Sequence, residues 1–153
     1  MLPELKRILL VEDDPRDLEL TMEALSENGL ANEMLAVRDG EEALDYLNRR
    51  AGFASRLAGN PAVILLDLKL PKVDGIEVLR AIRVDDKLKM IPVVVLTSSR
   101  QDRDLVETYR LGVNAYVVKP VNFPDFIAAV KQIGLFWAII NEPPPGSTRK
   151  WST

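Results

Sequence analysis

The stretch "AVILLDLKLPKVDG", residues 62–75, places five apolar residues directly before Asp67 and then continues to Pro71 and the pair Asp74–Gly75. A run that is apolar at every position is typical of a strand buried on both faces, as in a parallel sheet covered by helices. In open sheets of this kind, sites form outside the carboxyl ends of the strands. The stretch therefore predicts a central strand that ends on a functional carboxylate.

The same alternation of strand-length apolar runs and amphipathic helical stretches extends in both directions from this strand. The expected strands are residues 7–11, 33–37, 62–66, 91–96 and 115–118. The expected helices begin at Asp14 as N-cap with Pro15 after it, at Asp39 as N-cap with Glu42 three residues later, at Asp74–Gly75, within 100–111, and from about 123 to 140. Five strand–helix units predict an α/β fold, a doubly wound (βα)5 domain with a five-stranded parallel sheet.

Composition limits the chemistry that the chain can perform. Its 153 residues are 47% hydrophobic, enough for one domain with a substantial core, and they include no Cys and no His. Disulfides, thiolate metal sites and histidine general bases are therefore excluded, which leaves carboxylates, hydroxyls and amines. The net charge of −3 gives no general attraction to a phosphate backbone, so no nucleic-acid partner is expected.

Membrane association is not expected either. The first segment, "MLPELKRILLVEDD", has too short an apolar run for a signal sequence, and no window approaches the ~20 apolar residues of a membrane span. These features predict a soluble cytoplasmic protein.

Reactive side chains follow four of the expected strands. They are Glu12 and Asp13, then Asp67, Thr97 and Lys119. Carboxylates gathered at one sheet edge repel one another without a cation, and an oxygen-rich set without His suits Mg²⁺. A metal also lets a carboxylate act as nucleophile toward a phosphoryl group that it would otherwise repel. The pattern predicts a magnesium site and a phosphoacceptor at Asp67.

Four segments carry a family resemblance: "ILLVEDD", "LLDLKLPKVDG", "VVVLTSS" and "AYVVKP". In this order and spacing over residues 6 to about 133, they resemble the signatures of two-component response-regulator receiver domains. The resemblance implies a flavodoxin-like fold with strand order 2-1-3-4-5. We expect the receiver domain to occupy residues 1–140, with an extended last helix, and the proline-containing tail 141–153 to be extended or disordered.

The resemblance also assigns a role to each residue near the nucleophile. Asp67 would accept a phosphoryl group from the phosphohistidine of a partner sensor histidine kinase. Asp13 and Asp67 would bind Mg²⁺ directly together with the Lys69 carbonyl, and Glu12 would act partly through water. Phosphorylation and loss of the phosphoryl group would be the only chemistry, so the chain is not expected to be an enzyme in its own right.

Three further residues would respond to the phosphoryl group. Lys119 would pair with one phosphoryl oxygen, and its peptide bond to Pro120 would be cis. Thr97 would bond another oxygen, and Tyr116 would turn inward when Thr97 moves. Lys69 and Ser99, two residues after Asp67 and Thr97, differ from the commonest occupants of the family and lie where side chains reach an attacking water.

Other interpretations of these residues exist. Taken singly, Asp67 suits a strand-end cap, the acidic residues 12–14 suit a helix first turn, and Lys119 suits a solvated loop. A phosphohydrolase of the haloacid-dehalogenase type also uses an Asp nucleophile with Mg²⁺, but it needs a second Asp where this chain has Lys69. A flavodoxin-like cofactor binder would need a Gly- and hydroxyl-rich loop after the first strand, where this chain is acidic. A degenerate, purely structural receiver is the remaining alternative.

The ends of the chain and one long connection suggest how it signals. We expect no output domain after the receiver, and we therefore expect output through partners such as a downstream phosphotransfer or effector protein. Helical spacing places Leu135, Phe136 and Ile139 away from the core, which predicts a homodimer interface. The connection 51–61 exceeds the usual length and is either a recognition loop or a solvated insertion. Together with the ending "GLFWAIINEPPP", these features resemble receiver-only regulators paired with phytochrome-type kinases.

Overall fold

The computed structural model describes residues 5–148. Five parallel strands form one sheet in the order β2-β1-β3-β4-β5. The strands are β1 (Ile8–Val11), β2 (Met34–Val37), β3 (Val63–Leu66), β4 (Val93–Thr97) and β5 (Ala115–Val118). The predicted α/β fold, with its flavodoxin-like strand order, is confirmed.

The burial of each strand follows from its place in the sheet. The central strands β1, β3 and β4 are buried at every position, while the edge strand β5 is only half-buried. In register, Val11 lies beside Leu66, the residue before Asp67, so Glu12 and Asp67 leave neighbouring strands at the same level. Continuous apolar runs are thus what this sheet requires, because helices cover both of its faces.

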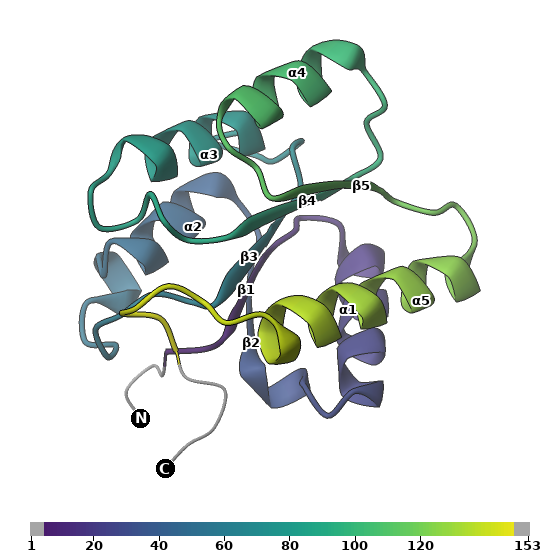
Figure 1. Ribbon diagram of the computed structural model, residues 1–153, viewed down its shortest axis with the longest axis horizontal. Coiled ribbons are helices and arrows are strands. Elements are labelled where there is room, and N and C mark those ends of the chain that lie inside the picture. Colours follow the sequence, from purple (N-terminus) through teal and green to yellow (C-terminus); the bar gives the residue numbers. More distant parts are fainter. Residues whose placement is uncertain (1–4, 149–153) are drawn as a thin grey trace.

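Helices cover the two faces unequally (Figure 1). One face carries α1 (Pro15–Glu27) and α5 (Phe123–Gly134), and the other carries α2 (Gly40–Leu47), α3 (Gly75–Val84) and α4 (Asp102–Arg110). Two separate apolar layers result, one on each side of the sheet. The layered arrangement leaves the strand ends free to form a site.

Side chains that precede the helices cap them. Asp14 accepts hydrogen bonds from the backbone N–H groups of Arg16 and Asp17 at 2.8 and 3.2 Å. Asp39 accepts one from Glu42 N–H at 2.7 Å, and Asp74 caps α3 in the same way. The N-caps Asp14 and Asp39 were predicted from the sequence, and a helix start was predicted at Asp74–Gly75.

The last helix departs from the expected continuous α-helix. It ends at Gly134 and continues as a π-helical segment, η3 (Leu135–Ile140). A π-helix advances fewer degrees per residue, which shifts the side chains that follow. Leu135 and Phe136 are exposed as expected, but the expected exposure of Ile139 is wrong: it is half-buried against the core, and Ile140 is exposed instead.

The same continuous segment bears on membrane association. Residues 123–140, 18 in all, are long and apolar enough to cross a bilayer, contrary to the expectation that no window approaches that size. The apolar side chains Phe126, Val130 and Ile133 lie in the core beneath this helix. Packing within the domain accounts for these three side chains, whereas Leu135, Phe136 and Ile140 of the same segment are exposed.

The long connection before β3 is folded against the domain. It contains a short 3-10 turn, η2 (Ala51–Phe53), and the fully buried side chain of Arg56. The chain after η3 returns to this connection, where Asn60 pairs with Ser147 and its carbonyl accepts a hydrogen bond from Thr148 N–H at 2.9 Å. The connection and residues 141–148 thus hold each other in place.

Candidate phosphoacceptor site

The polar site lies at the carboxyl ends of β1, β3, β4 and β5. Lys119, directly after β5, donates from Nζ to Glu12 Oε1 at 2.6 Å, to Asp17 Oδ2 at 2.8 Å and to Asp67 Oδ2 at 3.0 Å. Its side chain is 8% exposed. One buried ammonium group therefore joins acidic residues of three different segments, as expected for strand ends that meet at one sheet edge.

Three carboxylates gather beside this ammonium group. Oxygen atoms of Glu12, Asp13 and Asp67 lie within 4.8 Å of one another. Glu12 and Asp67 are buried, while Asp13 is exposed at the entrance. The set offers oxygen ligands only, which is the chemistry that hard divalent cations select.

Backbone amides hold the two buried carboxylates in place. Leu68 N–H donates to Asp67 Oδ1 at 2.7 Å, and Asp14 N–H donates to Glu12 Oε2 at 3.1 Å. With the bonds to Lys119, each of these carboxylates has both of its oxygens engaged. The geometry of the acidic pair is thus fixed by the fold.

Burial and charge alter the protonation of the pair. Burial raises the pKa of Glu12 to about 7, and the negative charge of Asp67 adds to this effect, although Lys119 opposes it. Burial alone would lower the pKa of Lys119, but hydrogen bonds to Asp17 and Glu12, with the charge of Asp67, raise it above its usual value. Lys119 is therefore a permanent cation, whereas Glu12 is poised to exchange a proton near neutral pH.

The hydroxyl side of the site is built from β4 and the chain that follows it. Thr97 is buried, and its Oγ1 accepts a bond from Ser99 N–H at 3.4 Å. Ser99 Oγ donates to Asp104 Oδ2 at 2.5 Å, and Tyr116 Oη donates to Ser99 O at 3.0 Å. Thr97, Ser99 and Tyr116 therefore belong to one hydrogen-bonded group.

A shallow cavity of about 430 Å³ opens at the exposed side of the carboxylates. Asp13, Lys69, Asp74 and Asp104 are among the residues that line it. Lys69 is exposed, so its ammonium group lies at the entrance and outside the buried network. Of the three clustered carboxylates, Asp13 is the one that lines this cavity, so the cavity borders the site on its exposed side.

Sequence reasoning missed two contributors to this site. Asp17 lies in the first turn of α1 and binds Lys119, and Asp104 lies in the first turn of α4 and binds Ser99. The only signal for Asp17 is an acidic side chain in the first turn of α1, a few residues after Glu12 and Asp13. No comparable signal marks Asp104, because its partner lies across the β4–α4 turn.

The expected cis bond between Lys119 and Pro120 is not found. All peptide bonds within residues 5–148 are trans, so this expectation is wrong for the structure. Lys119 reaches the carboxylates from a trans backbone, with its N–H donating to Thr97 O at 2.7 Å. Pairing of β5 with β4 is therefore enough to direct Lys119 to the site.

Comparison with known proteins identifies this arrangement. The sequence family "Response regulator receiver domain" matches residues 8–131. This span includes all five strands of the sheet and all the strand-end residues described above. The chain belongs to the response regulator receiver family. Asp67, Lys119 and the acidic residues after β1 stand within the matched receiver domain.

Several similar proteins are response regulators, and two of them are named as phytochrome or bacteriophytochrome response regulators. Response regulator Rcp1 of Synechocystis sp. is 42% identical over 86% of this chain and 88% of its own. The phosphorylated cyanobacterial phytochrome response regulator RcpA has a TM-score of 0.84 at 44% identity, covering 92% of this chain and 99% of RcpA. The bacteriophytochrome response regulator RtBRR is 62% identical, with a TM-score of 0.72, over 96% of this chain and 87% of its own.

One of these relatives has been seen with a metal. Rcp1 was solved in a Mn²⁺-bound form that has a TM-score of 0.84 at 40% identity, covering 91% of this receiver and 99% of Rcp1. The receiver described here carries an acidic cluster, Glu12, Asp13 and Asp67, suited to a divalent cation. The three carboxylates of this chain and the Mn²⁺-bound structure of Rcp1 both indicate a divalent cation.

Proposed function

We propose that this receiver accepts a phosphoryl group on Asp67 from the phosphohistidine of a sensor histidine kinase and signals through a changed interaction with a partner. The observation that carries the proposal is Lys119 Nζ, held between Glu12, Asp17 and Asp67 in a buried acidic site. RcpA, a receiver solved in phosphorylated form, supports it. The chain acts as a phosphoprotein and performs no other reaction.

Transfer breaks the phosphorus–nitrogen bond of the donor and forms a phosphorus–oxygen bond to an Asp67 carboxylate oxygen, while the donor imidazole keeps the electron pair. Before transfer, Asp67 Oδ2 is bonded to Lys119. After transfer, Lys119 pairs with a phosphoryl oxygen, and Thr97 Oγ1 donates to another. Both residues stabilise negative charge that develops during the transfer.

Mg²⁺ is the proposed cofactor, held by Asp13, Asp67 and the Lys69 carbonyl, with Glu12 acting partly through water. When bound, the ion neutralises charge on the incoming phosphoryl group. The support for this assignment is the oxygen-only donor set. The abundance of carboxylates and the absence of His favour Mg²⁺ over softer metals.

The proposed kinase is of the phytochrome type. Two relatives named as phytochrome or bacteriophytochrome response regulators, RcpA and RtBRR, match more than nine-tenths of this chain and at least 87% of their own length. We place the receiver in the cytoplasm, where such signalling needs neither nucleic-acid nor membrane contact by this chain. Its output is carried by a downstream phosphotransfer or effector protein.

The response to phosphorylation runs through Thr97, Ser99 and Tyr116. When Thr97 moves toward the phosphoryl group, its hydrogen bond from Ser99 N–H must change. Tyr116 donates to the carbonyl of the same serine, so its position is coupled to that movement. Tyr116 is the residue that carries the change to the α4–β5 surface.

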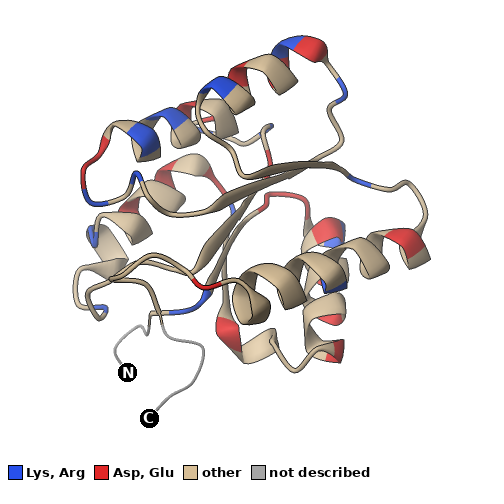
Figure 2. Cartoon of the chain, viewed as in Figure 1, with Lys and Arg blue, Asp and Glu red and all other residues tan. Residues whose placement is uncertain are grey.

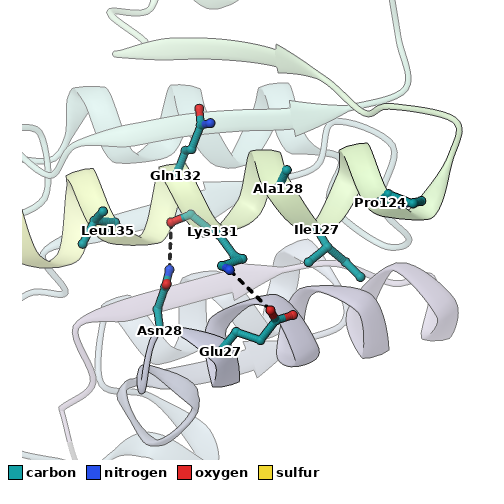
Figure 3. Close-up of a pocket in the computed structure, with 8 residues that line it drawn as sticks. All are labelled: Glu27, Asn28, Pro124, Ile127, Ala128, Lys131, Gln132 and Leu135. Atoms are coloured by element: carbon teal, nitrogen blue, oxygen red, sulfur yellow. Dashed lines mark hydrogen bonds and ion pairs between the residues drawn. The ribbon is translucent and has the colours of Figure 1, made fainter.

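A second surface supports a homodimer. Leu135, Phe136 and Ile140 on η3 are 44%, 46% and 58% exposed, and residues 123–140 contain few charged residues (Figure 2). Beside them, a groove of about 430 Å³ runs between α1 and α5, with Leu135 at one end and the Lys131–Glu27 ion pair along it (Figure 3). An apolar face of this kind suits a two-fold interface in which each residue is used twice. Leu135, Phe136 and Ile140 are the proposed interface residues, and Ile139, half-buried against the core, is no longer among them.

Two alternatives lack support from the site. A haloacid-dehalogenase-type hydrolase needs an acid two residues after the nucleophile, and Lys69 is an exposed base there. A degenerate receiver would have lost part of the acidic, Thr and Lys set. Here Lys119 donates to both Glu12 and Asp67.

Incubation with phosphorylated histidine kinases, followed by intact-mass measurement, tests the proposed function. Phytochrome-type and unrelated kinases are compared in Mg²⁺ and in EDTA. We expect a single phosphoryl adduct that needs metal, forms fastest with a phytochrome-type kinase and is lost in Asp67→Asn. An adduct that persists in Asp67→Asn at the wild-type rate would contradict the assignment.

A further inference from the structure

A cavity at the opposite edge of the sheet is lined by cations and by no acidic residue of the described chain. It has a volume of about 580 Å³ and lies between the end of α2, the connection 51–61 and the turn before β4. Its charged residues are Arg49, Arg56 and Lys87. Because Asn60 and Leu88, which also line it, precede β3 and β4, the cavity is at the amino ends of the strands, away from Asp67.

Arg56 supplies a buried positive charge without a negative partner. Its guanidinium group donates to four backbone carbonyls at 2.6–3.2 Å, those of Tyr46, Leu47, Leu57 and Gly59. Within residues 5–148 no carboxylate lies within 4 Å of it, although the residue is only 1% exposed. Burial lowers the pKa of Arg56, which shows that its charge is poorly solvated. A buried charge of this kind is stabilised by an anion in the adjoining cavity.

Arg49 is fixed at the rim of the cavity by its backbone. It has a φ of 55°, in the left-handed region that side-chain-bearing residues rarely adopt. Its Nε donates to the carbonyl of Arg56 at 3.2 Å, which ties the rim to the buried arginine. The described chain offers Arg49 no carboxylate at ion-pair distance, so its charge remains available.

Lys87 faces the same cavity from the turn before β4. Its carbonyl accepts a bond from Asn60 Nδ2 at 2.8 Å, which joins the two loops. Neighbouring acidic residues do not neutralise it: the Asp85 carboxylate accepts bonds from backbone N–H groups, and Asp86 pairs with Lys89. Its ammonium group forms no ion pair with any residue of the described part of the chain.

We propose that this cavity binds a small organic phosphate of about mononucleotide size. Its 580 Å³ lies within the range of about 300–1,000 Å³ typical of small-molecule sites. Guanidinium and ammonium groups together bind a phosphate dianion through charge-assisted hydrogen bonds. The organic part of the ligand would contact the apolar residues that line the cavity, Leu47, Ala54, Ala58 and Leu88.

A ligand in this cavity would also affect residues 141–148, which pack against the connection 51–61. Asn60, a lining residue, pairs with Ser147, and its carbonyl accepts a bond from Thr148 N–H. A ligand that joins Arg49 to Lys87 therefore also fixes residues 141–148 against the connection. The inference does not depend on phosphorylation of Asp67.

Calorimetric and NMR titrations test the site in Asp67→Asn protein with EDTA present, which removes the phosphoacceptor as a source of anion binding. The probes are adenosine monophosphate, ribose 5-phosphate, inorganic phosphate and uncharged adenosine. We expect saturable binding of the monophosphate at least about tenfold tighter than of inorganic phosphate or adenosine. Shifts should concentrate at Arg49, Lys87 and Ser147.

Variants of the exposed cations avoid loss of folding. Arg49→Asn suits the left-handed backbone, and Lys87→Gln keeps a polar chain; each should weaken the monophosphate at least about tenfold. Arg110→Gln on α4, an exposed cation elsewhere, is the matched control and should have no effect. Wild-type affinity in both cavity variants, or a monophosphate that binds no tighter than inorganic phosphate, would overturn the inference.

Discussion

Lys119 Nζ lies 2.6 Å from Glu12 Oε1, although the two residues are 107 positions apart in the chain. Their side chains are 8% and 3% exposed, so water does little to solvate either charge. The pair joins the carboxyl end of β1, inside the sheet, to that of the edge strand β5. Stability and chemistry are therefore coupled at this contact.

Lys119→Gln should destabilise the metal-free protein. Removing one member of a buried ion pair leaves uncompensated charge, which costs about 3–5 kcal/mol. Mg²⁺ should restore a larger share of the free energy of unfolding in the variant than in wild type, because the ion replaces the missing cation. Urea unfolding with and without Mg²⁺ measures both effects; equal Mg²⁺ stabilisation of the two proteins would contradict the proposed metal site.

Asp13 and Asp14 are adjacent carboxylates with different expected roles. Asp13→Ala should weaken Mg²⁺ binding by at least about tenfold, or about 1.4 kcal/mol, because a direct ligand is lost. Asp14→Ala should leave metal affinity nearly unchanged and cost about 0.5–2 kcal/mol of stability, because Asp14 caps α1. Isothermal titration and urea unfolding separate the two. Similar losses of Mg²⁺ affinity in both variants would remove the distinction.

The metal affinity should depend on pH through Glu12, whose pKa is raised to about 7 without metal. Below this pH, Mg²⁺ must displace a proton, so its affinity should rise about tenfold per pH unit and level off above pH 7. The raised pKa also favours the metal-free fold at low pH. That stability is fully present below about 4.5, the ordinary value, and is lost as the pH rises through 7.

Glu12→Gln is the control for this pH dependence. The variant has no proton to release at this position, so its Mg²⁺ affinity should vary much less between pH 5 and about 7. Calorimetry in buffers of different ionisation enthalpy counts the protons released. An unchanged slope in the variant would assign the dependence to another group.

Gly75 allows α3 to begin directly against the phosphoacceptor strand. A Cβ at this position would overlap the backbone carbonyl of Asp67 and Leu68 Cα. Gly75→Ala should therefore cost about 1–3 kcal/mol, as overpacking does, and slow phosphorylation by displacing Asp67. Gly52→Ala, where no atom lies within 4 Å of the added Cβ, is the matched control. Urea unfolding and phosphorylation rates are measured for both variants. Equal stability and equal rates in Gly75→Ala and Gly52→Ala would contradict the proposed role of Gly75.

Phe136→Glu combined with Ile140→Glu should convert a dimer into a folded monomer. Both side chains are exposed on η3, and a two-fold interface would bring the new charges together. Val84→Glu, at a side chain 78% exposed on α3, should remain dimeric. Equilibrium sedimentation decides between them. A monomeric wild-type protein, or a dimeric double variant, would assign the apolar face to another partner.

The strands, the N-caps and most site residues were predictable because each depends on local pattern. Apolar runs of strand length mark a sheet covered on both faces, and Asp14, Asp39 and Asp74 stand where helix caps are required. Reactive residues at the ends of these runs meet because parallel strands share one carboxyl edge. The sequence by itself therefore determined the fold and the group formed by Glu12, Asp13, Asp67, Thr97 and Lys119.

Contacts between segments decided the remainder. Asp17 and Asp104 entered the site only when α1 and α4 were placed over the strand ends. Gly134 has no side chain, which leaves room for Leu25 of α1. The π-helical segment η3 follows it and rotates the later side chains, so that Ile139 is half-buried and Ile140 is exposed. Arg56 became a buried cation because carbonyls from the end of α2 and from its own loop surround it. A local pattern carries no information on such contacts, since their energies depend on residues that only the folded chain brings together.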